Sequence, residues 1–498
     1  MEKEYDIIVS FYDTTYIKID CPYNMGIFNE ITERFSFYTP GYKFHPKVKA
    51  KMWDGIIRLF NRKNHTLPFG LLAQLVLFAN DSGYSIKVAE EILPTSNINE
   101  DIVESFCDDI LNLTNPPRDY QIEAVVAALK TGRRLILSPT GSGKSYIFHI
   151  AIRYLLEVEG FDKILLVVPT VNLVSQMLGD FIEYGQNDPK FDRNDYLTIP
   201  NKRNIKNGDY KVIISTWQSL QRMPSEYFNG SDEFVGFDAL LVDEVHTFAA
   251  TVAGSIAEKS NKIPVKIGMT GTLANTKTAE MQLIGLFGQP YQTTTTKDLM
   301  EAGILSTMKI TAIQMNHPEL APKMKYADEM EYLRNHAPRN QFIASFAEKT
   351  AGNSLILFQN HDQGDTIVKL LREKSNKRIF HVTGRADSDD NEMVRQYCEA
   401  NHDAIVVANY QVFSTGINIK NLHNVIFASP TKSAIRILQS IGRALRKHDS
   451  KDIANIIDLY DEFGDDKTKN HTFRHFLERY QIYMQSKFDV NILQGPTF

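Results

Sequence analysis

Hydrophobic residues gather in short uninterrupted runs, separated by longer stretches in which apolar positions recur at helical spacing. Such runs are typical of parallel strands buried on both faces, and the stretches between them of helical crossovers. The runs form two series: 135–137, 164–168, 212–215, 239–242 and 266–269, then 354–358, 379–382, 404–407, 425–428 and 453–459. The pattern therefore predicts an α/β protein with two doubly wound parallel sheets in series.

The first 95 residues have a different pattern, which predicts a small α+β unit. Short strands are expected at 7–9 and 16–19, and helices at 26–35 and 69–80. Polar and apolar residues alternate over 44–53, which predicts an extended strand with its lysines on one face. Asp54-Gly55 then predicts a hairpin turn with a return strand at 56–60.

Linker-like stretches, one of which contains Pro116-Pro117, divide the chain into four regions. Residues 1–95 form the small α+β unit, and 96–303 and 304–460 hold the two series of strands. Residues 461–498 are predicted to be a helical extension, with a helix at 472–487 and a loose end.

Composition excludes a globally basic protein. Of 498 residues, 43% are hydrophobic and 23% charged, and the formal net charge is −5. Binding to nucleic acid must therefore come from local patches. Residues 43–63, here called the basic segment, carry seven Lys or Arg against one acid, Asp54. With its aromatic neighbours this segment suits phosphate backbones, although a solvated hairpin edge protected by lysines has the same composition.

Three cysteines lie far apart at 21, 107 and 398, which predicts neither a disulfide framework nor a zinc cluster. The charged N-terminus lacks a signal-peptide core, and the apolar run 71–79 is too short to cross a bilayer. We expect a cytoplasmic protein that makes no contact with membranes.

One strand of the first series leads into a glycine-rich loop. The run 135–137 is followed by Ser138-Pro-Thr-Gly-Ser-Gly-Lys-Ser145 and an apolar helix-like stretch. Glycines let backbone N–H groups surround an anion, and the helix N-terminus adds its dipole. We expect Lys144 on the β- and γ-phosphates of ATP and the Ser145 hydroxyl on Mg²⁺. The residues expected to bind ATP here are Pro139, Thr140, Gly141, Ser142, Gly143, Lys144 and Ser145.

Two adjacent acids end another strand of this series. The run 239–242 leads directly into Asp243 and Glu244. Ligands of open α/β sheets bind at the carboxyl ends of the strands. Asp243 is expected to hold Mg²⁺, and Glu244 to orient and deprotonate the attacking water.

With Asp-Glu-Val-His at 243–246, the chain resembles superfamily 2 DExH helicases over about residues 115–450. The resemblance implies two tandem RecA-like P-loop domains that close on ATP and move along nucleic acid. Arg118-Asp-Tyr-Gln121 resembles the adenine-reading motif, so Arg118 and Gln121 are implied to bind ATP. Ser138 stands where the usual loop pattern has glycine.

Further motifs of the first series imply contacts to nucleic acid and coupling. The stretches 169–173 and 215–220 resemble motifs that bind strand phosphates, which points to Thr170 and Thr216. Thr270-Gly-Thr272 resembles the motif that links the state of ATP to strand binding. His246 is expected to belong to that linkage; a hydrogen-bonded interior histidine is the alternative.

The second series carries the remaining motifs of the resemblance. The stretch 414–418 implies Thr415 on phosphate and Gly416 near the nucleotide, with Asn418 where the family usually has Asp. The stretch 439–446 implies Gln439 at the nucleotide and Arg443 and Arg446 as arginine fingers on the γ-phosphate.

The stretches 51–55 and 409–418 resemble recombination helicases of T-even phages. This implies a monomer in the bacterial host cytoplasm that acts with ATP and Mg²⁺ in recombination, repair and replication control. Its partners would be single-stranded, duplex and branched DNA, including forks, Holliday junctions and D-loops, and RNA–DNA hybrids. The N-terminal unit would bind DNA through Lys47, Lys49, Lys51 and Arg58.

Four alternatives remain open: an RNA helicase, a duplex translocase that does not separate strands, a restriction motor, and a non-catalytic clamp. The presence of all five expected catalytic residues argues against the clamp: Lys144, Asp243, Glu244, Arg443 and Arg446.

Overall fold

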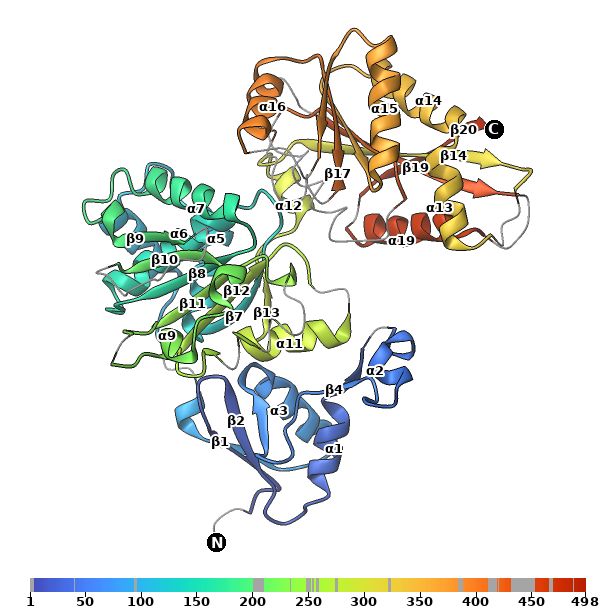
Figure 1. Ribbon diagram of the computed structural model, residues 1–498. Helices are drawn as coiled ribbons and strands as arrows, with labels where there is room; N and C mark the ends of the chain where they lie inside the picture. Colours follow the sequence, from blue (N-terminus) through green and yellow to red (C-terminus); the bar gives the residue numbers. More distant parts are fainter. Residues whose placement is uncertain are drawn as a thin grey trace. The chain divides into compact units, whose positions relative to one another are not determined.

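In the computed structural model the chain forms two compact units, and its helices and strands are labelled in Figure 1. The first unit comprises Met1–Ser138 and Gly143–Thr293, and the second Pro139–Ser142 and Thr294–Phe498. The structure describes all residues except 1–3, 40, 94–95, 200–209, 233, 248–251, 253–254, 257–258, 274–275, 321–323, 384–387, 411–418, 420, 431–452, 465–468 and 487.

The first unit is built around a seven-stranded sheet in which every pairing is parallel. Its strand order is β13-β7-β12-β11-β8-β10-β9. All five predicted strands are present, whereas β9 and β13 were not predicted. The strands are β7 (Arg133–Leu137), β8 (Ile164–Val168), β9 (Tyr196–Ile199), β10 (Val212–Thr216), β11 (Ala239–Asp243), β12 (Val265–Thr270) and β13 (Pro290–Gln292).

Successive residues of these strands enter two different cores, because side chains alternate across a sheet. Ile136, Leu166 and Leu241 pack under one group of helices, while Leu135, Leu165 and Leu240 face the other side. Figure 1 shows α5, α6 and α7 gathered over the first face. That layer comprises α4 (Glu100–Phe106), α5 (Asp119–Lys130), α6 (Lys144–Glu157) and α7 (Val171–Tyr184), and the second α8 (Trp217–Leu220), α9 (Ser225–Asn229) and α11 (Lys277–Phe287).

The predicted small α+β unit is present at the N-terminus and shares its core with the second layer. Its sheet has the order β5-β2-β1-β6. Gly70 permits the close approach of α11, because a Cβ there would lie 1.9 Å from the Ile284 carbonyl oxygen. The elements are β1 (Ile7–Phe11), β2 (Tyr16–Asp20), α1 (Ile27–Arg34), β5 (Thr66–Pro68), α3 (Leu72–Asp81) and β6 (Ile86–Val88).

The expected strand at 44–53 is wrong: this stretch forms a short helix, α2 (Pro46–Lys49). Pro46 occupies the first turn, where its fixed φ favours a helix, and the His45 side chain accepts a hydrogen bond from the Lys47 N–H at 3.3 Å. The return strand β4 (Ile56–Arg58) exists, but it pairs with β3 (Ser36–Tyr38). The three lysines therefore do not share one face of a strand.

Two buried cations dock the N-terminal unit against the amino ends of β7 and β12. The Lys266 ammonium donates to the Thr14 carbonyl at 3.1 Å and the Thr15 hydroxyl at 3.2 Å. Arg133 donates to the Thr14 carbonyl as well, and to the Leu286 carbonyl at 2.8 Å. Burial lowers the pKa of Lys266 and brings that of Arg133 to about 10. Such cations need these oxygens, because a buried charge without them is costly.

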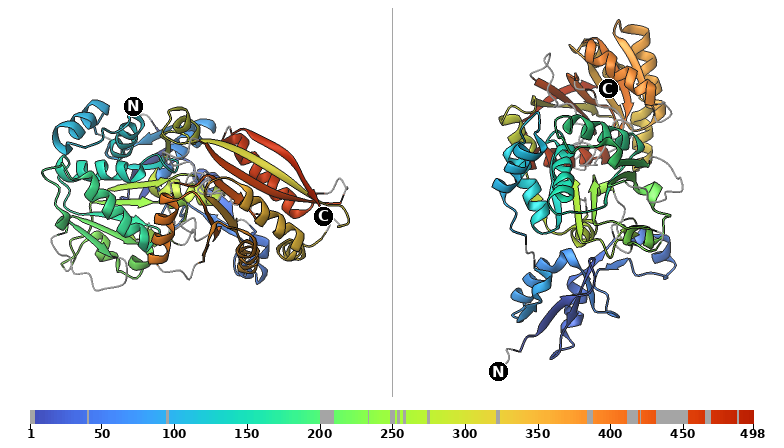
Figure 2. Two further views of the ribbon diagram at one scale, coloured as in Figure 1. Left: turned by 90° about the horizontal axis from the view of Figure 1, so that it is seen from above. Right: turned by 90° about the vertical axis from the view of Figure 1, so that its left-hand side faces the viewer.

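The second unit contains another seven-stranded parallel sheet, in the order β16-β17-β15-β18-β19-β14-β20. Its five predicted strands are present. The prediction missed β14 and also β20, which pairs with β14 and replaces the expected loose end. Figures 1 and 2 show the long strands β14 and β19 side by side. The strands are β14 (Thr307–His317), β15 (Ser354–Phe358), β16 (Arg378–Val382), β17 (Ala404–Asn409), β18 (Asn424–Phe427), β19 (Ile453–Phe463) and β20 (Val490–Thr497).

Helices cover this second sheet as well. One core joins the sheet to α14 and α15, and a smaller one joins it to α19. The helices are α12 (Thr296–Glu301), α13 (Tyr326–Asn335), α14 (Ala337–Lys349), α15 (His361–Lys374), α16 (Ser388–Ala400) and α19 (His471–Gln485).

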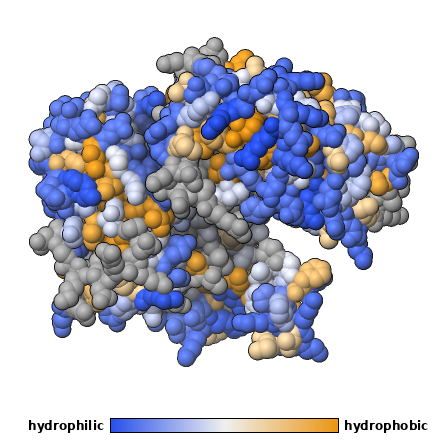
Figure 3. All heavy atoms as spheres, turned by 45° about the horizontal axis from the view of Figure 1, so that its top comes forward, coloured by the Kyte–Doolittle hydropathy of each residue, from blue (hydrophilic) through white to orange (hydrophobic). Residues whose placement is uncertain are grey.

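On the face drawn in Figure 3, hydrophilic residues cover most of the described surface and hydrophobic ones form smaller groups.

Candidate functional site: the phosphate loop and the carboxyl ends of β7, β11 and β12

The glycine-rich loop joins β7 to α6, as the sequence predicts. Gly141 and Gly143 adopt positive φ of 87° and 86°, which L side chains rarely tolerate. The Ser142 hydroxyl donates to the Pro139 carbonyl at 2.7 Å. Lys144 begins α6, so the N-terminus of that helix lies directly after the loop. This is the backbone arrangement that binds phosphate.

The two predicted adenine-motif residues lie beside this loop. Gln121 is buried in α5, and its Oε1 accepts the Arg118 N–H at 2.9 Å. A Cβ on Gly143 would lie 2.4 Å from Gln121 Nε2, so the carboxamide contacts the loop closely. Ser138 directly follows β7, and its N–H donates to the Thr270 carbonyl at 2.8 Å, which joins the loop to the end of β12.

Lys144 and the two acids meet at one edge of the sheet. The Lys144 ammonium lies 2.9 Å from Glu244 Oε1, and these side chains are only 13% and 18% exposed. Asp243 ends β11 and is buried, and its Oδ1 accepts the Glu244 N–H at 2.9 Å. Glu244 has a φ of +48°, an unfavourable conformation for a side-chain-bearing residue. Three residues predicted from two motifs are thus brought into contact.

The environment drives the pKa values of the two acids apart. Burial, and then the Glu244 carboxylate, raise the pKa of Asp243. Burial would also raise the pKa of Glu244, but the Lys144 ammonium and the His246 contact outweigh it and lower this pKa. Glu244 is therefore held as a carboxylate by the lysine that is predicted to bind phosphate.

The predicted coupling residues form a continuous chain with Glu244. His246 Nδ1 lies 3.2 Å from Glu244 Oε2 and 2.7 Å from the Thr270 hydroxyl. That hydroxyl donates to the Thr272 carbonyl at 3.0 Å. His246 is thus a hydrogen-bonded interior histidine that contacts both Glu244 and Thr270, and its coupling role stays a prediction.

Ser145 and Asp243, the two residues predicted to bind Mg²⁺, supply a hydroxyl and a carboxylate oxygen, which are ligands that Mg²⁺ prefers. The residues present therefore fit the ion. The Ser145 Oγ lies 2.9 Å from the hydroxyl oxygen of Tyr184, a residue that the sequence analysis missed. No local signal could have found it, because 39 positions separate the two residues and Tyr184 belongs to no motif.

Two threonines are predicted to bind strand phosphates: Thr170 lies two positions after β8, and Thr216 is the last residue of the neighbouring strand β10. Both are N-terminal caps of helices, α7 and α8. The Thr216 hydroxyl lies 2.9 Å from Ser219 Oγ, whereas the buried Thr170 hydroxyl has no hydrogen-bond partner among the described residues. Both threonines lie at the same carboxyl edge of the sheet as Asp243.

The basic segment presents its cations to solvent. Lys47, Lys49 and Lys51 are exposed, and Phe44 beside them is 79% exposed. Arg58 differs from the lysines, because Asp54 accepts its hydrogen bond at 2.5 Å. In Figure 1, α2 stands out from the body of the N-terminal unit.

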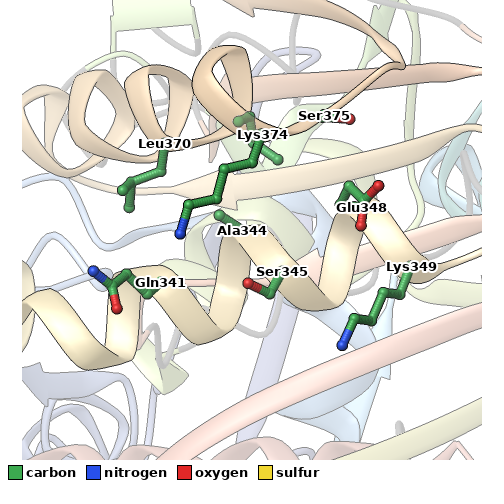
Figure 4. A pocket seen from close by; sticks show the side chains of 9 residues that line it. Gln341, Ala344, Ser345, Glu348, Lys349, Leu370, Lys374 and Ser375 are labelled. Carbon is green, nitrogen blue, oxygen red and sulfur yellow. The ribbon is translucent and has the colours of Figure 1, made fainter.

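The predicted residues of the second unit lie outside the described residues: Thr415, Gly416, Gln439, Arg443 and Arg446. Two of the cavities in the described part of that unit lie as follows. One, of about 90 Å³, lies between α14 and α15, where Figure 4 shows Lys374 above Ala344 and Gln341. The other, of about 400 Å³, lies at the ends of β14, β19 and β20. Neither cavity is lined by any predicted site residue.

A buried histidine of α6 gives a stability prediction. His149 is fully buried, neither ring nitrogen has a hydrogen-bond partner among the described residues, and burial lowers its pKa to about 3. Between that pH and about 6.5 the unfolded chain binds the additional proton, so stability falls as pH falls through this window. We expect His149→Leu to remove about 1 kcal/mol of the stability difference between pH 7 and 5.5.

Tryptophan fluorescence during urea unfolding measures this difference, because both tryptophans, Trp53 and Trp217, belong to the first unit. An identical pH dependence in variant and wild type would show that His149 binds a proton as readily in the folded protein as in the unfolded chain.

No helix in the described ranges combines the length and the apolar character that a membrane span requires.

Comparison with known protein families assigns a model to each region. Residues 6–89 match "DNA helicase UvsW, N-terminal", residues 114–275 match "Type III restriction enzyme, res subunit", and residues 338–448 match "Helicase conserved C-terminal domain".

Individual relatives agree with these matches. The ATP-dependent DNA helicase uvsW of Enterobacteria phage T4 is 34% identical over 97% of this chain and 98% of its own. A putative ATP-dependent helicase, IRC3 of Saccharomyces cerevisiae, is 24% identical over 69% of this chain and 51% of its own. The crystal structure of T4 UvsW covers 99% of both chains with a TM-score of 0.51 and 30% identity.

Proposed function

Because the chain belongs to the UvsW family of ATP-dependent DNA helicases, we propose that it uses ATP to unwind or branch-migrate branched DNA. Its substrates would be forks, Holliday junctions, D-loops and RNA–DNA hybrids. The observation that carries the catalytic part is the 2.9 Å contact between Lys144 and Glu244 beside the buried Asp243. It joins a phosphate-binding lysine to a candidate base at the carboxyl ends of parallel strands.

The contact suggests how ATP starts its own hydrolysis. In the structure, the Lys144 ammonium pairs with the Glu244 carboxylate. The phosphates of ATP compete for that ammonium, because they carry more negative charge than one carboxylate. When Lys144 turns to them, Glu244 loses the cation that lowers its pKa and becomes a stronger base for the attacking water.

The other roles follow from the motifs. Ser145 and Asp243 would hold Mg²⁺, which when bound neutralises charge on the phosphates. Arg118 and Gln121 would bind the adenine side of the nucleotide, and Arg443 and Arg446 would stabilise the γ-phosphate during transfer. His246 would pass the state of Glu244 to Thr270, since it contacts both.

DNA would lie along the edge that holds Thr170 and Thr216, and Thr415 would add a contact from the second unit. The free Thr170 hydroxyl supports this, because a phosphate oxygen would satisfy it. The basic segment would bind the backbone of a second arm of the branch.

Strand release from a four-way junction with one labelled arm tests the proposal. We expect release with ATP and Mg²⁺, and none with a non-hydrolysable ATP analogue. Hydrolysis without strand release on any branched substrate would instead favour a translocase that does not separate strands, and greater activity on duplex RNA would favour an RNA helicase.

Reversing the charge of three lysines in the basic segment should weaken binding to branched DNA. Changing Lys47, Lys49 and Lys51 together to Glu should lower the slope of log affinity against log salt by about 1 for each lost phosphate contact. Fluorescence anisotropy of a labelled junction over a salt series measures the slope. The Lys→Arg triple variant keeps the charge and should keep the slope; an unchanged slope in the Glu variant would remove the segment from the DNA interface.

A further inference from the structure

Tyr184 contacts the residue of α6 that is expected to bind the metal. Its hydroxyl oxygen lies 2.9 Å from Ser145 Oγ. Ser145 is the second residue of α6, and Tyr184 is the last residue of α7. The contact therefore joins two helices of the first unit at the phosphate loop.

Packing fixes where the Tyr184 ring lies. The ring makes edge contacts with Tyr146, at 4.8 Å between centroids, and with His149, at 5.6 Å. Both partners lie on α6, one and four positions after Ser145. The Tyr184 ring is thus held against the same helix that carries Ser145. The Tyr184 hydroxyl therefore stays in place and can bond Ser145 in only one of the serine rotamers.

A serine that binds a cation has a specific requirement for its proton. The hydroxyl has two lone pairs and one hydrogen, and only a lone pair can face the metal. The hydrogen needs an acceptor on the opposite side. Partners of this kind orient metal ligands, and their loss typically costs about 10- to 100-fold in metal affinity. A phenolic oxygen can accept this hydrogen.

We propose that Tyr184 is a positioning residue for the metal ligand Ser145. The Tyr184 hydroxyl oxygen accepts a hydrogen bond from the Ser145 hydroxyl. This bond selects the serine rotamer that leaves the lone pairs available for Mg²⁺. This proposal rests on the proposed role of Ser145 in the ATP site. It adds a residue outside the motifs to the residues that control nucleotide binding.

Tyr184→Phe tests the proposal, because it keeps the ring and its packing and removes only the hydroxyl. We expect the variant to need about tenfold more Mg²⁺ for half-maximal binding of a fluorescent ADP analogue. Affinity for the analogue without Mg²⁺ should not change. Tyr146→Phe is the matched control: it removes a neighbouring hydroxyl that donates to the Asn115 carbonyl, and its Mg²⁺ requirement should equal that of wild type.

A double-mutant cycle with Ser145→Ala tests whether Tyr184 affects Mg²⁺ binding through Ser145. Once the serine hydroxyl is gone, Tyr184→Phe should cause no further change in the Mg²⁺ requirement. If the single Tyr184→Phe variant needed the same Mg²⁺ concentration as wild type, the proposal would be overturned. A lower Mg²⁺ requirement would also overturn it, because Tyr184 would then hold Ser145 away from the metal. Failure of wild type to bind the analogue would instead contradict the proposed function itself.

Discussion

Lys144→Ala should abolish DNA-stimulated ATP hydrolysis, with a loss of about 10³-fold or more in turnover. The lysine is the cation at the start of α6 and pairs with Glu244 at 2.9 Å. Its removal takes away charge stabilisation of the transferred phosphate and also leaves the buried Glu244 carboxylate without its lysine partner. We therefore expect ATP affinity and turnover to fall together, as measured by nucleotide binding and phosphate release in the presence of DNA.

Lys190→Ala provides the control, since it removes an exposed lysine of the same unit that also pairs with a glutamate, Glu157. Turnover in that variant should match wild type. If Lys144→Ala hydrolysed ATP at the wild-type rate, the assignment of the phosphate loop would be wrong.

Glu244→Gln should separate binding from chemistry. The amide has nearly the shape of the carboxylate and can still accept a hydrogen bond from Lys144, but it cannot take a proton from water. We expect wild-type ATP affinity or tighter binding, because the competing carboxylate has lost its charge, with turnover lower by about 10³-fold. Single-turnover hydrolysis with binding measured in parallel shows both effects.

Glu280→Gln is a suitable control, since this glutamate of α11 also lies near a lysine, Lys277, at 3.4 Å. Equal losses of affinity and turnover in Glu244→Gln would mean that Glu244 acts in binding, and the base would have to be sought elsewhere.

Patterns that depend on local chemistry were predictable from the sequence. Uninterrupted apolar runs identified ten parallel strands, because strands buried on both faces need apolar residues on both. The loop before Lys144 was predictable because phosphate binding requires glycine at positive φ, and Gly141 and Gly143 adopt it. Adjacent acids at the end of a buried strand indicated a site, since parallel strands bring their carboxyl ends to one edge.

Features that depend on tertiary contacts were not predictable. Alternation over 44–53 favoured a strand, but Pro46 and the His45 cap form a helix there. Strand β20 pairs with β14, which lies more than 170 positions earlier in the chain. Lys266 begins a run that was predicted to be a buried strand, but no local pattern showed that its ammonium contacts the backbone of Thr14. Tyr184 reaches Ser145 only through the packing of two helices.

ATP hydrolysis measured side by side with no nucleic acid, single-stranded DNA, duplex DNA, a four-way junction and RNA tests the central claim most directly: that this site converts ATP into work on branched DNA. The account predicts strong stimulation by the junction, weaker stimulation by RNA, and none in Lys144→Ala with any of them. A wild-type rate that is the same with every nucleic acid as with none would contradict it.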